Sequence, residues 1–272
     1  MIGQIIAEGL EHLYEAVSLP KKTVSWDKPT TLIEQFDTII KQSKIEIVDV
    51  IWCAGKTRFD AEEAEVEKEF IFFNAVVNGL RSYNIDLRFS LLSSAGGTYE
   101  NTQFVNDINA ISPVRPYAFG KLRQEELLLT AGITARIYRL SSVYGYKYRN
   151  PRLGLINTMI ANALSGDPVK IFGRQDNFRD YISHFDIARY IIKKLSDASS
   201  NTHVLASGRA TSIQALVQQV QNLTNKRVKT LYIDAVDNAN DIIFEQCVIP
   251  PDFQITSLEE GILNLYARMR FS

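Results

Sequence analysis

The chain has 272 residues and a net charge of −1, which is enough length for one large domain or for one domain with a smaller lobe. The nearly neutral charge excludes a broad basic field, so we expect neither nucleic acid nor a membrane surface as a partner. Two cysteines and three histidines are scattered and fit no metal-ligand spacing, which indicates no metal site and reduced thiols in a cytoplasmic protein. No apolar run approaches the roughly 20 residues that span a bilayer, and the first residues lack the layout of a signal peptide.

The first half of the chain alternates helical and strand patterns. Helical spacing covers 1–13, 31–42 and 61–83, and another helix begins near 116. Dense apolar runs predict buried strands over 45–55, 87–94 and 133–145, and a short β-branched run predicts a strand at 23–27. Strands that alternate with helices favour an α/β fold with a parallel sheet covered on both faces.

The second half has a different texture from about residue 146 onward. A polar stretch with proline and glycine leads into an expected helix at 155–166, a short strand at 169–173 and a helix at 186–197. Thr211 or Ser212 is placed to cap one more helix. These elements predict a smaller lobe after the sheet.

Tyr117 and Lys121 form the most informative pair in the sequence. Their i, i+4 spacing on a helix places both side chains on one face. An ammonium beside a phenol stabilises the phenolate, which could exchange a proton with a substrate hydroxyl. A tyrosine that merely packs on a surface helix is the alternative interpretation.

Small and hydroxyl-bearing residues end the strand before this helix. The run Ser93-Ser94-Ala95-Gly96-Gly97 falls at the carboxyl edge of the predicted sheet, where open α/β sheets build their sites. A serine there could hydrogen-bond the substrate oxygen that Tyr117 addresses.

Five motifs in order resemble the extended short-chain dehydrogenase/reductase family of NAD-dependent sugar-nucleotide epimerases and dehydratases. They are SSAGGTYE, then P-x-x-P-Y-x-x-x-K, RLSSVYG, FRDYISHFD and finally a proline followed by SLEEG. The resemblance as a whole runs from Gly3 to about Leu265. The resemblance implies a Rossmann-like doubly wound parallel sheet over 1–148 and a smaller C-terminal substrate lobe over 149–272, with 184–206 returning to the sheet. It also implies a homodimer formed by the helices at 61–83 and 117–130.

The resemblance also implies roles for individual residues. Tyr117 would be the acid and base, Lys121 would support it and hold the nicotinamide ribose, and Ser94 would orient the substrate oxygen, with Ser93 and Thr98 as alternatives. Ala54 and Gly55 would line the cofactor, and Asn74 would brace the active-site strands. In the second lobe Arg179 and Asn157 would contact a nucleoside diphosphate, although a salt bridge to Asp180 or Asp186 is an equal alternative for Arg179. Ser142 stands where the family has asparagine.

The cofactor region departs from the family pattern. Gly3 matches the third glycine of G-x-x-G-x-x-G, whereas the central strand and the first two glycines would lie before Met1. We therefore expect weak NAD binding by the N-terminally truncated sheet. A start site assigned too late, a degenerate gene and a fold that closes the gap with another segment are all open. Asp27 favours NAD if 23–27 is the second strand; Lys21 and Lys22 would favour NADP if that strand is 14–20.

The resemblance orders the possible reactions. Ser94 is followed by no acid, which disfavours dehydration. A 4-epimerase that acts on a nucleoside diphosphate sugar through a transient keto intermediate, in surface polysaccharide synthesis, is the first expectation. A sugar-nucleotide reductase is the second. A catalytically silent sugar-nucleotide-binding protein is the third.

Overall fold

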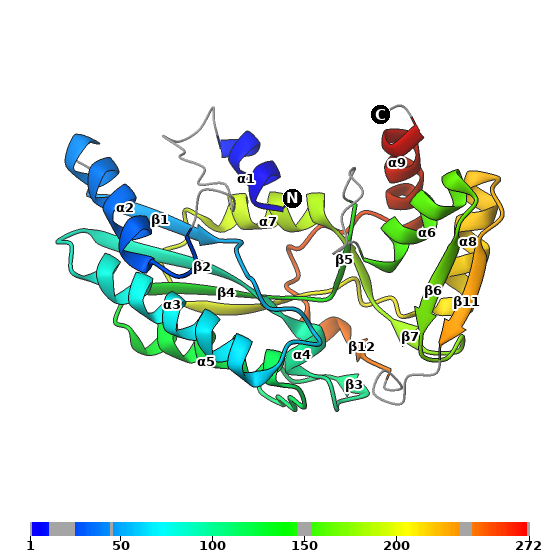
Figure 1. The fold of residues 1–272 in the computed structure, drawn as a ribbon, viewed down its shortest axis with the longest axis horizontal. Helices are drawn as coiled ribbons and strands as arrows, with labels where there is room; N and C mark the ends of the chain where they lie inside the picture. The colour runs from blue at the N-terminus through cyan, green and yellow to red at the C-terminus, as the bar shows by residue number, and fades with distance from the viewer. Residues whose placement is uncertain (1, 11–24, 44–45, 146–153, 234–240, 271–272) are drawn as a thin grey trace.

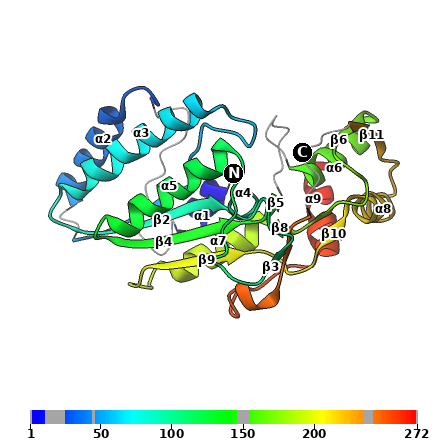
Figure 2. The same cartoon turned by 90° about the horizontal axis from the view of Figure 1, so that it is seen from below.

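A computed structural model describes residues 2–10, 25–43, 46–145, 154–233 and 241–270. The central sheet contains four parallel strands in the order β1-β2-β4-β9, which are β1 (Ile47–Trp52), β2 (Asp86–Ser94), β4 (Thr134–Leu140) and β9 (Asn201–Leu205). Figures 1 and 2 show helices α2 (Pro29–Ser43), α3 (Glu63–Arg81) and α5 (Pro116–Thr130) on one face and α1 (Ile2–Leu10) and α7 (His184–Lys194) on the other. The predicted Rossmann-like α/β sheet is confirmed.

Alternation of side chains along the strands creates the two cores. In β1, Val50 and Trp52 pack under α2 and α3, whereas Ile51 packs on the α1 and α7 side. Helix α1 buries Ile2 and Ile6 against that second face, as its helical spacing predicts. Both faces of the sheet are therefore apolar, which is typical of parallel strands.

The segment before α2 differs from the prediction. Lys28 N donates a hydrogen bond to Ser25 O at 3.1 Å, and Pro29 opens the helix directly afterwards. The described residues Ser25–Lys28 thus form a turn, and the strand predicted at 23–27 is wrong there. The alternative strand at 14–20, with Lys21 and Lys22, lies outside the described residues. In the described part of the chain, no strand pairs with the outer edge of β1.

The predicted strand at 133–145 divides in two. Ser141 N donates to Leu205 O and Ser142 N donates to Asp180 O, so the chain leaves the central sheet after β4 and joins another pairing. The second piece, β5 (Ser142–Tyr144), runs parallel to β8 (Tyr181–Ser183). This change of partner carries the chain from the sheet to the smaller lobe.

The smaller lobe has its own apolar core. Helices α6 (Leu155–Ser165), α8 (Ile213–Thr224) and α9 (Leu258–Arg270) pack with the buried side of a two-stranded parallel pair, β6 (Pro168–Phe172) with β11 (Lys229–Ile233), at the side of the molecule away from α2 (Figure 1). Ser212 caps α8 by accepting a hydrogen bond from Ala215 N, one of the two caps that the sequence predicts. The shorter elements are α4 (Ala95–Thr98), β3 (Phe104–Val105), β7 (Phe178–Arg179), β10 (Thr211–Ser212), β12 (Ile243–Phe244) and the 3-10 helix η3 (Gln246–Val248).

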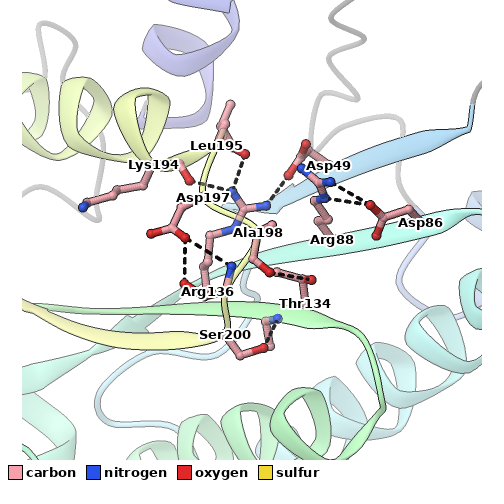
Figure 3. A network of polar contacts seen from close by, with 12 residues as sticks. Asp49, Asp86, Arg88, Thr134, Arg136, Lys194, Leu195, Asp197, Ala198 and Ser200 are labelled. Atoms are coloured by element: carbon pink, nitrogen blue, oxygen red, sulfur yellow. Dashed lines mark hydrogen bonds and ion pairs between the residues drawn. The ribbon is translucent and has the colours of Figure 1, made fainter.

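A buried arginine joins the sheet to the C-terminal end of α7. Figure 3 shows Arg136 of β4 beneath that helix, with its guanidinium between Asp49 of β1 and two backbone carbonyls. Arg136 Nη1 donates to Lys194 O at 2.8 Å and to Leu195 O at 2.9 Å, and Nη2 forms an ion pair with Asp49. A cation at a helix C-terminus satisfies carbonyls that the helix leaves open and interacts favourably with its dipole.

None of the helices in the described part of the chain combines the length and apolar character needed to span a bilayer. Within the same residues, no group of three or more histidine, cysteine, aspartate or glutamate side chains is arranged to hold a metal ion.

Candidate active site

Tyr117 and Lys121 lie on one face of the first turns of α5. Pro116 occupies the first helical position, where its missing N–H costs no hydrogen bond. The Lys121 Nζ atom lies 5.9 Å from the centre of the Tyr117 ring. The structure thus brings together the two residues that the i, i+4 spacing predicts as neighbours.

Lys121 is buried and held by two side chains. Its Nζ donates to Gln124 Oε1 at 3.1 Å and forms an ion pair with Glu69 Oε1 at 3.5 Å. Gln124 Nε2 also donates to Glu69 Oε1, at 3.3 Å, which closes a triangle of contacts. Glu69 belongs to α3, so the packing of α3 against α5 fixes the ammonium group.

The second carboxylate oxygen of Glu69 binds the loop that follows β1. Glu69 Oε2 accepts hydrogen bonds from Lys56 N at 2.5 Å and from Thr57 N at 2.6 Å. Burial alone would raise the pKa of Glu69, but the charge of Lys121 and the two backbone N–H donors outweigh it, so the net pKa is lowered. The side chain is therefore a carboxylate at neutral pH.

Gly55 lies in the same loop and faces the Lys121 ammonium. A Cβ atom built on Gly55 would come 3.5 Å from Glu69 Oε1 and 3.7 Å from Lys121 Nζ. Backbone thus approaches the ammonium closely, and Ala54 precedes Gly55 in the loop that follows β1. This loop and Lys121 form one wall of the site.

An aromatic ring covers the other side of Tyr117. The Phe59 ring packs edge-on to Tyr117 with 6.0 Å between centroids, and the Arg115 guanidinium lies 4.2 Å from the Phe59 ring centre. Arg115 is in turn paired with Glu100 at 3.1 Å. Tyr117 is therefore half-buried between its own helix and the Phe59 ring, which Arg115 contacts.

The hydroxyl residues at the end of β2 have separate partners. Ser94 caps α4 by accepting a hydrogen bond from Gly97 N at 3.1 Å, and Gly97 packs closely against Ala118, the residue after Tyr117. Ser93 is buried and donates to Glu125, while Thr98 donates to Ser94 O at 2.7 Å. Ser94 thus lies at the start of α4, whose Gly97 contacts α5, whereas the side chains of Ser93 and Thr98 are engaged in local structure.

A cavity of about 320 Å³ opens between β5, β8 and the start of α6. It is lined by Ser142 and Arg179, together with Tyr144, Tyr181 and backbone near Gly154. Arg179 Nη1 donates to Phe178 O at 2.8 Å, and burial lowers the pKa of its guanidinium. Asp180 and Asp186, the alternative partners weighed for this arginine, accept hydrogen bonds from Ser207 and Thr256. The structure therefore brings Ser142 and Arg179 together in one cavity.

Residues 14–206 match the NAD dependent epimerase/dehydratase family. The chain belongs to this family. Family membership accounts for the order of the motifs.

Several 4-epimerases are similar to this chain in sequence or in structure. A UDP-glucuronate 4-epimerase of Thermodesulfobacterium geofontis is 25% identical over 183 residues, which are 63% of this chain and 56% of that protein, so the chain spans little more than half the length of this curated relative. The UDP-glucose 4-epimerase of Thermus thermophilus in complex with NAD superposes with a TM-score of 0.80 at 16% identity, over 99% of this chain and 96% of the other. The UDP-glucose 4-epimerase of Thermotoga maritima with UDP-glucose gives 0.76 at 17% identity, over 100% and 96%. At these identities the superpositions show the fold alone.

Four residues named from the family motifs lie outside the two clusters. Asn74 accepts a hydrogen bond from Asn78 Nδ2 at 2.9 Å on the outer side of α3, and Asn157 accepts one from Gly145 N at 2.9 Å inside the lobe. Asp27 is exposed in the turn before α2, not at the end of a strand. Gly3 lies in the first turn of α1, where its missing Cβ allows contact with Cys53.

The sequence contains one signal for Glu69 that motif matching missed. The buried residues of α3 follow the spacing of an apolar stripe, and Glu69 stands inside that stripe between Val66 and Phe73. A carboxylate on the buried face of a helix needs a partner. Asn74 lies off the stripe, so the helical period favoured Glu69 over Asn74 as the α3 residue near Lys121.

Proposed function

We propose that this protein is an NAD-dependent epimerase of nucleoside diphosphate sugars, with inversion at sugar carbon 4 as the reaction. The observation that carries the proposal is the Tyr117–Lys121 pair, held by Glu69 beside the backbone of Gly55. The names of the relatives, which are 4-epimerases of UDP-glucose and UDP-glucuronate, support carbon 4 as the centre. UDP-sugars are accordingly the first substrates to test.

The residues present fit a dinucleotide at the Lys121 wall of the site. A Cβ atom at Gly55 would come within 4 Å of both Lys121 Nζ and Glu69, so the backbone of this loop lies directly beside the ammonium. Two N–H donors of Lys121 contact Gln124 and Glu69, which leaves a third to donate to a ribose hydroxyl. Ala54 and Gly55 would line the nicotinamide end, and Lys121 would hold its ribose. NAD is the proposed cofactor, with NADP as the alternative.

NAD held by Lys121 and the loop of Ala54 and Gly55 would supply a hydride acceptor for the sugar carbon and a hydride donor to its opposite face. Tyr117 takes the proton of the substrate hydroxyl as that carbon becomes a carbonyl, and gives it back afterwards. The Lys121 ammonium beside the Tyr117 ring stabilises the negative charge that develops during this transfer. Ser94 accepts a hydrogen bond from Gly97 N, so its own O–H is available to donate to the same substrate oxygen.

Arg179 is the proposed anchor for the diphosphate. A planar guanidinium matches phosphate oxygens, and its burial in the cavity strengthens the attraction to an anion. Ser142, on the same wall, would contact the sugar or the nucleotide.

The test is product analysis by NMR with UDP-glucose and UDP-glucuronate in the presence of NAD⁺. We expect the 4-epimer to accumulate, and Tyr117→Phe to lower kcat by at least about 100-fold because proton transfer is lost. Tyr232→Phe, on the exposed strand β11, is the matched control and should keep full activity. Activity unchanged in Tyr117→Phe would contradict the assignment.

Two other outcomes favour the alternatives. A reduced sugar formed only with added NADH or NADPH would favour a reductase. Thermal stabilisation by a UDP-sugar with no response to millimolar NAD⁺ would favour a catalytically silent binding protein.

A further inference from the structure

We propose that Glu69 is a positioning residue that couples the loop at 54–57 to Lys121, so that one carboxylate sets both cofactor affinity and the charge beside Tyr117. The inference deepens the proposed function and rests on it for its kinetic part. Its structural part depends only on the contacts of Glu69.

The geometry divides the carboxylate into two tasks. Oε2 accepts the backbone N–H groups of Lys56 and Thr57, whereas Oε1 contacts Lys121 Nζ and Gln124 Nε2. Charge-assisted hydrogen bonds to a buried carboxylate are stronger than neutral ones and expensive to leave unmade. Movement of the loop therefore moves the carboxylate, and with it the ammonium.

The carboxylate also sets the net charge near Tyr117. Lys121 contributes a positive charge from α5 and Glu69 cancels part of it from α3. Arg115 lies over the Phe59 ring, and its charge is paired with Glu100. The strength with which the site stabilises a phenolate thus depends on whether Glu69 is ionised.

Glu69→Gln and Glu69→Asp separate the two tasks. Glutamine removes the charge and keeps the length, so the positive charge of Lys121 is no longer compensated. We therefore expect the acidic limb of the plot of kcat against pH to move to lower pH by about one unit. Aspartate keeps the charge but is one methylene shorter, so the limb should stay in place. Both variants weaken the loop contacts, and we expect the Kd for NAD⁺, followed by tryptophan fluorescence, to rise about 10-fold.

Glu67→Gln is the matched control on the same helix. Glu67 also pairs with a cation of α5, Arg123, but the pair is exposed at the surface. Its removal should change neither the pH profile nor the Kd. If Glu69→Gln matches Glu67→Gln in both measurements, the proposal is wrong.

Amide hydrogen exchange of the protein without cofactor separates this inference from the proposed function. Exchange at Lys56 and Thr57 should be at least 10-fold faster in Glu69→Gln than in wild type, and unchanged in Glu67→Gln. Faster exchange in a protein that binds no NAD⁺ would support the loop contact and overturn the epimerase proposal. Unchanged exchange would overturn the role of Glu69 whatever the activity. Should Glu69→Gln fail to fold, amide exchange and the Kd for NAD⁺ are measured on Glu69→Asp instead. If neither differs from wild type, the proposal is wrong.

Discussion

At the scale of single residues, the motif Val-Tyr-Gly owes its form to close packing around His184. Gly145 has φ = 119°, a conformation that favours glycine, and a side chain there would collide with the His184 ring. His184 Nδ1 lies 3.1 Å from Tyr144 O. Burial, assisted by the charge of Arg268, lowers the pKa of His184 to about 4. The imidazole is therefore neutral in the folded protein at pH 7.

This buried histidine predicts an acid-sensitive fold. The unfolded chain takes up the proton at its ordinary pKa of 6.5, whereas the folded chain resists it until about pH 4. The contribution is complete above pH 6.5 and is lost as pH falls toward 4, about 3 kcal/mol in all. Urea unfolding at pH 7 and pH 4.5 should show a smaller loss of stability in His184→Gln than in wild type. Equal losses would contradict the prediction.

The active-site pair shows what a local pattern can and cannot predict. Tyr117 and Lys121 are four residues apart on one helix, so their proximity follows from helical geometry. Glu69 is 52 residues from Lys121, and only the packing of α3 on α5 brings the two together. Gln124 could have been inferred as an i, i+3 neighbour of Lys121.

At the scale of elements, the contact between Arg136 and α7 ties a central strand to a covering helix (Figure 3). Arg136→Met would remove the cation beside Asp49 and the side-chain donor to Leu195 O, while Lys194 O would keep its hydrogen bond from Asp197 N. We expect a loss of about 3 kcal/mol or more in the free energy of unfolding, because breaking a buried pair strands the remaining groups.

Arg88→Met provides the control for that measurement. Arg88 lies on the neighbouring strand and pairs with Asp86 at 2.7 Å, but that carboxylate is half-exposed. Removing an exposed pair costs about 1 kcal/mol or less. Equal losses for the two variants in urea unfolding would contradict a special role for the buried arginine.

Long periodic segments could be predicted from the sequence, and short strands could not. The helices α1, α3, α5 and α6 and the strands β1, β2 and β4 carry enough residues for a period of 3.6 or an apolar run to stand out. Strands β3 and β12 contain two residues each and pair across about 140 positions. Their formation depends on tertiary contact, so no local pattern predicts them.

At the scale of the whole molecule, apolar side chains lie exposed on the outer surface of α3 and α5. Ile71 and Phe119 are each more than half-exposed, and Leu129 is nearly equal to them. Exposed apolar patches on a folded protein mark sites of protein–protein contact when their side chains are contiguous. We propose that these helices meet their copies in a homodimer.

Ile71→Glu tests the homodimer by placing a charge in the proposed interface. We expect sedimentation equilibrium to show a dimer for wild type and a monomer, or a dimer weakened by at least 10-fold, for the variant. Phe172→Glu, an equally exposed position on β6 of the smaller lobe, should leave the dimer intact. A wild-type monomer, or equal effects of both variants, would contradict the proposal.

Two family motifs in the C-terminal half, Val-Tyr-Gly and Ser-Leu-Glu-Glu-Gly, pack directly against each other. The hydroxyl of Tyr144 from Val-Tyr-Gly presses against Gly261 of Ser-Leu-Glu-Glu-Gly, where any side chain would collide with the phenol. Helix α9 thus packs against the end of β5, and Tyr144 of that strand also lines the Arg179 cavity. A chimaera that takes its last helix from a relative would keep this contact only if the residues at positions 144 and 261 both came from the same protein.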